Sequence, residues 1–246
     1  MKAATVGFSQ RIKLSWLEHT SRLVLAAVPR EQISPSLQDL LKDRLSIGGS
    51  AQRGTREKAI TILNKIWVNV RVDLMPLRND GLALLARLPD GLHIAVHWGM
   101  TMAAYPFWFT VAESTGRLLR LQGNATAAQI QRRVREQLGE RETVARAARR
   151  IIRSFVDWAV IREGTSKGLY VPADPIAIED PELIAWLIEA NLVASGALSA
   201  PLKSLSQSPA LFPFKPNSHN SIESLLRRRL EIHRQNLNEP VVARSR

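Results

Sequence analysis

The sequence predicts a mainly α-helical protein, and three observations lead to this class. Apolar residues recur at helical spacing through most of the first 105 residues, glycine and proline mark the ends of these stretches, and hydrophobic residues make up 45% of the 246-residue chain. The expected organisation is a helical N-terminal region over 1–105, a module of helices and a β-hairpin over 106–172, and a helical C-terminal extension over 173–246 that includes a proline- and serine-rich loop.

Four amphipathic helices are expected before residue 90. Pro29 ends the first helix, and Pro76 is compatible with the first turn of the fourth. A glycine-rich link, IGGSAQRG, precedes the third helix, and Thr55 is expected to cap it. The four helices are expected over 15–28, 36–45, 55–67 and 74–88.

The next stretch, residues 91–112, reads GLHIAVHWGMTMAAYPFWFTVA and contains no Asp, Glu, Lys or Arg. Its length matches the roughly 20 residues of a membrane-spanning helix. Pro106 interrupts it, however, and two histidines lie within it, so we expect two buried helices that meet near Pro106. A membrane-associated protein that uses 91–112 remains an alternative, although a membrane partner is not the favoured interpretation.

From residue 107 the order of elements becomes regular. A helix over 107–121 is followed by Thr126 and Gln129, which have the spacing of a capping box and open a second helix. A third helix is expected over 140–158, and β-prone runs on either side of the loop GTSKG predict a hairpin. Three helices followed by a hairpin is the order of a winged helix-turn-helix.

The C-terminal extension is expected to contain two helices. The first spans 181–194, and the loop that follows over 195–221 is rich in proline and serine, with Phe212 and Phe214 as its anchors. The last helix is expected over 221–237, SIESLLRRRLEIHRQNL, where a run of three arginines goes around the helix.

The third helix of the module separates an apolar stripe from an arginine face. At about 100° per residue its apolar residues fall on one side. The arginine face lies opposite and consists of Arg146, Arg149, Arg150 and Arg153. Arginines three and four residues apart repel one another unless an anion neutralises them. A helix in the major groove of duplex DNA meets phosphates and guanine acceptors, so the arginine face is expected to bind DNA.

Further residues of the module are expected to join this interface. Residues at the start of a recognition helix face base edges, while the preceding helix and the hairpin tip reach the backbone. These residues are Arg132, Arg133, Arg141, Thr143 and Lys167. The glycine-rich link and the residues just after it allow two interpretations: secondary phosphate contacts from Arg53, Arg56 and Lys58, or a solvated loop.

Composition supports a polyanionic partner. The formal net charge is +12 and the sequence pI is about 10.9. The chain has no cysteine, which excludes disulfides, Cys-ligated metals and thiol nucleophiles, and which is typical of the reducing cytoplasm where the protein is expected.

Nothing in the sequence favours catalysis. His93 and His97 are four residues apart, but no third ligand is evident, so no metal is expected. No cofactor, small-molecule substrate or catalytic arrangement of side chains is expected, and the protein is interpreted as a non-enzyme.

The same elements resemble a known family. An N-terminal segment that opens near GFS precedes an apolar helical middle, a T-x-x-Q helix, an arginine-rich helix that ends in FVDWAVI, and a KGLYVP hairpin. Over about residues 105–172 this order resembles the BrxA-like accessory proteins of bacterial phage-defence (BREX-type) systems. The resemblance implies a non-catalytic DNA-binding subunit of a larger antiviral defence complex with ATPase and methyltransferase components. The tail after Pro172 departs from the compact members of that family.

Two functions therefore compete for the basic module. The first is a DNA-binding accessory subunit of a defence or DNA-processing complex, which binds duplex DNA through the winged-helix face. The second is an interaction subunit whose basic face docks an acidic protein.

Overall fold

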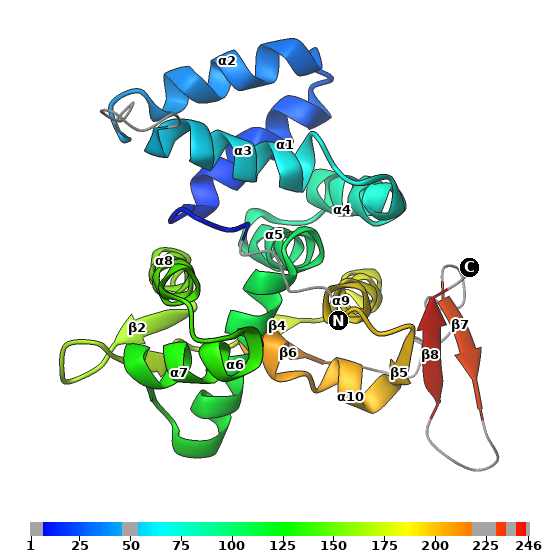
Figure 1. Ribbon diagram of the computed structural model, residues 1–246. Coiled ribbons are helices and arrows are strands. Elements are labelled where there is room, and N and C mark those ends of the chain that lie inside the picture. Colours follow the sequence, from blue (N-terminus) through cyan, green and yellow to red (C-terminus); the bar gives the residue numbers. More distant parts are fainter. Residues whose placement is uncertain (1–6, 46–53, 218–229, 235–239, 245–246) are drawn as a thin grey trace.

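The computed structural model describes residues 7–45, 54–217, 230–234 and 240–244. Helices dominate this part of the chain and the sheets are small, which confirms the predicted α-helical class (Figure 1). The helices of the N-terminal region are α1 (Leu14–Leu25), α2 (Arg30–Leu41), α3 (Thr55–Trp67), the short η1 (Val72–Leu74), α4 (Met75–Arg87) and α5 (Asp90–Ala104).

Two helix starts differ from the prediction. α2 begins at Arg30 and not at residue 36, because its buried stripe of Ile33, Leu37 and Leu41 continues across Pro35, and this packing keeps a proline inside the helix. In α3 the N-cap is Gly54, and Thr55 is already the first helical residue.

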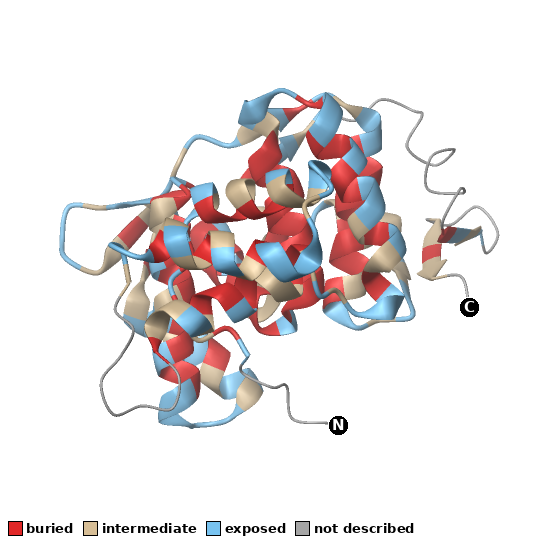
Figure 2. Ribbon diagram, turned by 90° about the horizontal axis from the view of Figure 1, so that it is seen from above, coloured by how far each residue is buried: buried red, intermediate tan, exposed pale blue. Residues whose placement is uncertain are grey.

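α5 is the central helix of the molecule, and every residue from His93 to Ala104 is buried. It meets α6 (Pro106–Gln122) at Tyr105, as the position of Pro106 predicts. α9 (Pro181–Ser195) packs against α5, where Gly99 makes room for the indole of Trp186: a Cβ at Gly99 would lie 2.4 Å from that ring. Figure 2 shows the buried residues gathered where the helices face one another. Of the helices in the described ranges, none combines the length and the hydropathy needed to cross a membrane.

The module expected over 106–172 consists of α6, β1 (Ala125–Thr126), α7 (Ala127–Leu138), α8 (Glu142–Asp157), β2 (Ile161–Glu163) and β3 (Leu169–Pro172). The capping box is confirmed: Gln129 N donates to Thr126 Oγ1 at 3.1 Å, and Thr126 N donates to Gln129 Oε1 at 2.8 Å. The hairpin is also confirmed, and β3 lies between β1 and β2 in an antiparallel sheet that the sequence did not predict in full, since β1 is only two residues long.

The C-terminal part differs most from the prediction. Its elements are β4 (Ile176–Ile178), α9, β5 (Ser199–Pro201), α10 (Leu202–Ser206), η2 (Pro209–Leu211), β6 (Phe214–Pro216), β7 (Leu230–His233) and β8 (Val241–Arg244). The helix predicted over 221–237 is wrong in its described part, because residues 230–233 form a strand paired antiparallel with β8. Leu230 and Ile232 alternate with two exposed polar residues, and this period of two is that of a strand. The rest of that predicted helix, with its three arginines, lies outside the described residues except Arg234.

An aromatic cluster joins the three regions into one core. Trp98 of α5 lies within 5.0–5.9 Å, centroid to centroid, of rings from α6, α8 and the tail. Phe212 and Phe214 belong to this cluster, so the predicted anchors of the loop are confirmed. The division of the chain at residues 105 and 172 stays a prediction.

Candidate nucleic-acid interface

α8 carries the separation of faces that its sequence predicts. Its apolar side is buried against the core: Val144, Ala148 and Ile151 are fully buried, as is Phe155. The opposite side is open, and three residues of the arginine face are exposed: Arg146, Arg149 and Arg153. This burial fixes the rotation of α8, so the exposed arginines project from one side of the module.

Most of the arginine face has partners within the protein, which reduces the repulsion that the sequence predicts. Arg146 lies 3.6 Å from Glu142, and Arg153 lies 3.4 Å from Glu163 of β2. Arg149 forms neither an ion pair nor a hydrogen bond with any residue that the structure describes. Within the described ranges it is therefore the member of the arginine face without an internal partner.

Arg150 does not share the open side of α8, contrary to the expectation that all four arginines face DNA. It is half-buried, and its guanidinium donates a hydrogen bond to the carbonyl of Ser9. The reason is its position on the helix, 40° further around than Arg146 at 100° per residue, which turns it toward the N-terminal segment.

The N-terminal segment, residues 8–12, binds along the second half of α8. Ile12 N donates to Ser154 Oγ at 2.9 Å, Trp158 Nε1 donates to the carbonyl of Ile12 at 2.9 Å, and Arg11 pairs with Asp157. Phe8 is buried against Tyr105 and Trp108. Sequence reasoning missed this support, and its available signal was the polar Ser154 in the otherwise apolar stripe, where a buried hydroxyl needs a partner.

The arginines of α7 are neutralised locally. Arg132 and Arg133 both contact Glu136, at 3.0 and 3.1 Å, and hydrogen bonds from Arg132 and then Arg133 lower the pKa of that carboxyl. Arg135 pairs with Glu140 at 3.1 Å. Arg132 and Arg133, the two arginines of α7 that were expected to contact DNA, therefore already pair with a carboxylate of the protein.

The start of α8 is exposed but has no side-chain cap. Arg141 occupies the N-cap position, and its guanidinium donates to the carbonyl of Leu138 at 3.2 Å. Thr143 lies exposed in the first turn. These two residues lie at the end of α8 where base contacts were expected.

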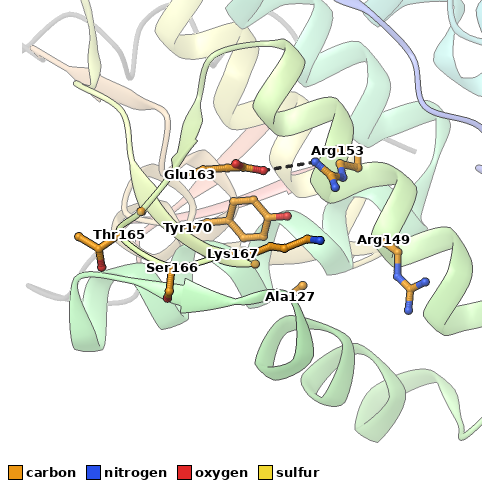
Figure 3. Close-up of a pocket in the computed structure, with 10 residues that line it drawn as sticks. Ala127, Arg149, Arg153, Glu163, Thr165, Ser166, Lys167 and Tyr170 are labelled. Carbon is orange, nitrogen blue, oxygen red and sulfur yellow. Dashed lines mark hydrogen bonds and ion pairs between the residues drawn. The ribbon is translucent and has the colours of Figure 1, made fainter.

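A hollow of about 510 Å³ lies between α8 and the loop that joins β2 to β3. Three cations line this hollow: Arg149 and Arg153 from α8, and Lys167 from the loop. Lys167 is exposed and has no ion pair or hydrogen bond among the described residues. Figure 3 shows Lys167 and the hydroxyl of Tyr170 pointing toward α8, and Arg153 reaching across to Glu163. The hollow thus brings together cations from α8 and from the hairpin that follows it, and two of them, Arg149 and Lys167, have no partner among the described residues.

Register explains which hairpin side chains reach the hollow. Glu163 of β2 lies opposite Tyr170 of β3, so both side chains project from the same face of the sheet, and both line the hollow. Arg162 alternates with Glu163 and projects from the other face.

The residues considered for secondary phosphate contacts near the glycine-rich link lie in different surroundings. Arg56 donates to the carbonyls of Lys42 and Leu45, at 2.6 and 3.0 Å, and so caps the end of α2. Lys58 is half-buried on α3, and Arg53 lies outside the described residues. Arg56 is therefore occupied by a structural contact in place of the phosphate that the sequence suggested.

The two histidines of α5 belong to a buried polar group with Glu18 of α1. Trp67 Nε1 donates to His97 Nδ1 at 3.1 Å, while His97 Nε2 and His93 Nδ1 each lie 3.2 Å from Glu18 Oε1. Burial lowers the pKa of His97. Burial alone raises the pKa of Glu18, but the hydrogen bonds and charge of the two histidines outweigh it and lower that pKa. The group stabilises the contact of α1, α3 and α5.

Compared with models of protein families, with curated proteins and with solved structures, the chain matches none. The resemblance to BrxA-like proteins stays a prediction from the residues quoted above.

Proposed function

We propose that the protein binds duplex DNA through the hollow and the exposed side of α8. The observation that carries the proposal is the position of Arg149 and Lys167: both are exposed, both line the hollow, and neither has an anionic partner among the described residues. Unpaired cations converging from two elements form a site for an anion that comes from outside the molecule.

The elements around the hollow fit a winged helix-turn-helix. In this interpretation α8 is the recognition helix, α7 precedes it across a short turn, and the β2–β3 hairpin is the wing. The buried stripe of α8 and the N-terminal segment hold the helix from behind, so Arg146, Arg149 and Arg153 face the groove. The wing brings Lys167 to the DNA backbone beside the helix.

Binding to labelled duplex DNA, single-stranded DNA and RNA, titrated with salt, tests this proposal. Loss of one phosphate contact reduces the slope of log affinity against log salt by about 0.9, which weakens binding about eightfold at about 0.1 M salt. Arg149→Gln is expected to show this loss. Arg71→Gln is the matched control, since it removes one charge from an exposed ion pair with Asp73 in the N-terminal region. Equal affinity and slope for Arg149→Gln and the wild type would contradict the assignment.

A basic face that docks an acidic protein gives a different result. If the basic face docks an acidic protein, that acidic partner would co-purify with this chain, and no duplex DNA would bind even at low salt. A place for the DNA-binding subunit in a larger bacterial defence or DNA-processing complex follows from the resemblance to BrxA-like proteins. Co-purification with DNA-processing subunits from a bacterial host that expresses them tests this extension.

A further inference from the structure

Glu163 stands out because it is an acidic residue within a cluster of cations. It lines the hollow together with Arg149, Arg153 and Lys167, and its carboxylate lies 3.4 Å from Arg153 Nη1. The hairpin register fixes it on the face of the sheet that looks into the hollow. Two of the three cations have no partner among the described residues, so one carboxylate leaves the site positively charged.

The contact between Glu163 and Arg153 is weak enough to be exchanged. Both side chains are about half exposed, at 55% and 49%, and the distance of 3.4 Å is long for a charge-assisted hydrogen bond. Exposed pairs of this kind are screened by water and contribute little to stability. A phosphate, by contrast, offers a guanidinium two oxygens at once and can also accept hydrogen bonds from Lys167 and the Tyr170 hydroxyl.

We propose that Glu163 occupies the anion position of a phosphate site in this hollow, so that a ligand phosphate displaces its carboxylate from Arg153. This inference rests on the proposed function and deepens it: Glu163 lowers the affinity of the site for phosphate and sets the number of counterions that binding releases. The ligand chemistry is a phosphate group, carried by the DNA backbone or by a free phosphate.

Neutralising Glu163 tests the exchange directly. Glu163→Gln is expected to bind duplex DNA about fivefold more tightly at about 0.1 M salt and to show a steeper salt slope. Asp73→Asn is the control with the same change in net charge, since Asp73 pairs with Arg71 in the N-terminal region, and its affinity should stay within about twofold of the wild type. An equal gain in both variants would overturn the inference, because general charge would then explain it.

A double-mutant cycle with Arg153→Gln assigns the effect to this ion pair. In the Arg153→Gln background the gain from Glu163→Gln should fall from about fivefold to less than about twofold, because the competition acts through Arg153. A gain of the same size in both backgrounds would refute the exchange. Thermal unfolding of each variant checks the fold, which these exposed residues should leave unchanged.

Inorganic phosphate separates this inference from the DNA proposal. We expect phosphate to shift the side-chain NMR signals of Arg149 and Arg153, and to do so at lower concentration in Glu163→Gln than in the wild type. If phosphate acts in this way and no duplex binds, the phosphate site stands and the DNA function fails. If duplex binds but phosphate leaves both arginines unchanged and Glu163→Gln gains nothing, the DNA function stands and the inference fails.

Discussion

α7 and the hollow between α8 and the hairpin each carry three basic residues, but their cations are neutralised differently. On α7, Arg132 and Arg133 share Glu136, and Arg135 pairs with Glu140. Around the hollow, Arg149 and Lys167 have no partner in the described parts of the chain. If the hollow is the binding surface, as we propose, the number of basic residues does not locate it, whereas the cations that have no internal anion among the described residues do.

α7 and α8 also differ in how their first turns are capped. α7 begins with a complete capping box on Thr126, while α8 begins with Arg141 and has no side-chain cap. Capping residues stabilise a helix locally, and arginine at the cap position does not. α7 therefore follows the local rules of stability, and α8 departs from them at the end where we propose contact with DNA.

The largest expected effect tests how the N-terminal segment, which lies along α8, is anchored to the core. Phe8→Ala removes a fully buried ring that contacts Tyr105 and Trp108, so the free energy of unfolding should fall by about 3–5 kcal/mol. Denaturant unfolding measures this change. Leu121→Ala is the control, because Leu121 is 78% exposed and its truncation should matter by no more than about 0.5 kcal/mol. A loss of less than about 1 kcal/mol in Phe8→Ala would show that Phe8 does not anchor the N-terminal segment to the core.

Substitutions at the two N-cap positions, Thr126 of α7 and Arg141 of α8, should have smaller effects on stability, of opposite sign. Thr126→Ala should destabilise the protein by about 1 kcal/mol and leave DNA affinity unchanged, because it acts only on the start of α7. Arg141→Ser should stabilise it by about 0.5–1 kcal/mol and weaken DNA binding, because it adds a cap and removes a cation. Thermal unfolding and duplex binding measure both properties. Tighter DNA binding by Arg141→Ser would contradict the role given to the start of α8.

Acid should affect the histidine group and not the hollow. The pKa of His97 is lowered from 6.5 in the folded protein, so the unfolded state binds a proton that the folded state excludes, and stability falls as the pH drops below about 6.5. The lowered pKa of Glu18 has the same effect: stability also falls as the pH drops below 4.5, the ordinary pKa of a glutamate side chain.

Urea unfolding between pH 7 and 5 measures this dependence, and the slope should be smaller in His97→Gln. The histidine group does not line the hollow, so DNA affinity of the folded protein should change little. Stability that rises toward pH 5 would contradict the placement of His97.

Local features of the sequence predicted much of this fold. The helical phase separated the apolar stripe of α8 from its arginines, and the spacing of Thr126 and Gln129 predicted the start of α7. Both depend on residues within a few positions of one another, where propensity and periodicity act directly.

Contacts between different elements could not be predicted in this way. The bond from Arg150 to Ser9 spans 141 positions, and the pairing of β7 with β8 replaced the helix expected from a leucine- and arginine-rich run. Which arginines of the module lack a carboxylate was equally hidden, because Glu163 reaches Arg153 only through the register of the hairpin.

Two matched double variants compare the two basic surfaces most directly, by salt-titrated binding to duplex DNA. Arg149→Gln with Lys167→Gln removes the two cations of the hollow that have no partner in the described part of the chain, and Arg132→Gln with Arg133→Gln removes two paired cations of α7. The hollow variant should lose about two units of salt slope and bind about 50-fold more weakly at about 0.1 M salt, while the α7 variant should lose less than about fivefold. Equal losses in the two variants would show that DNA responds to total charge and that the hollow is not its site.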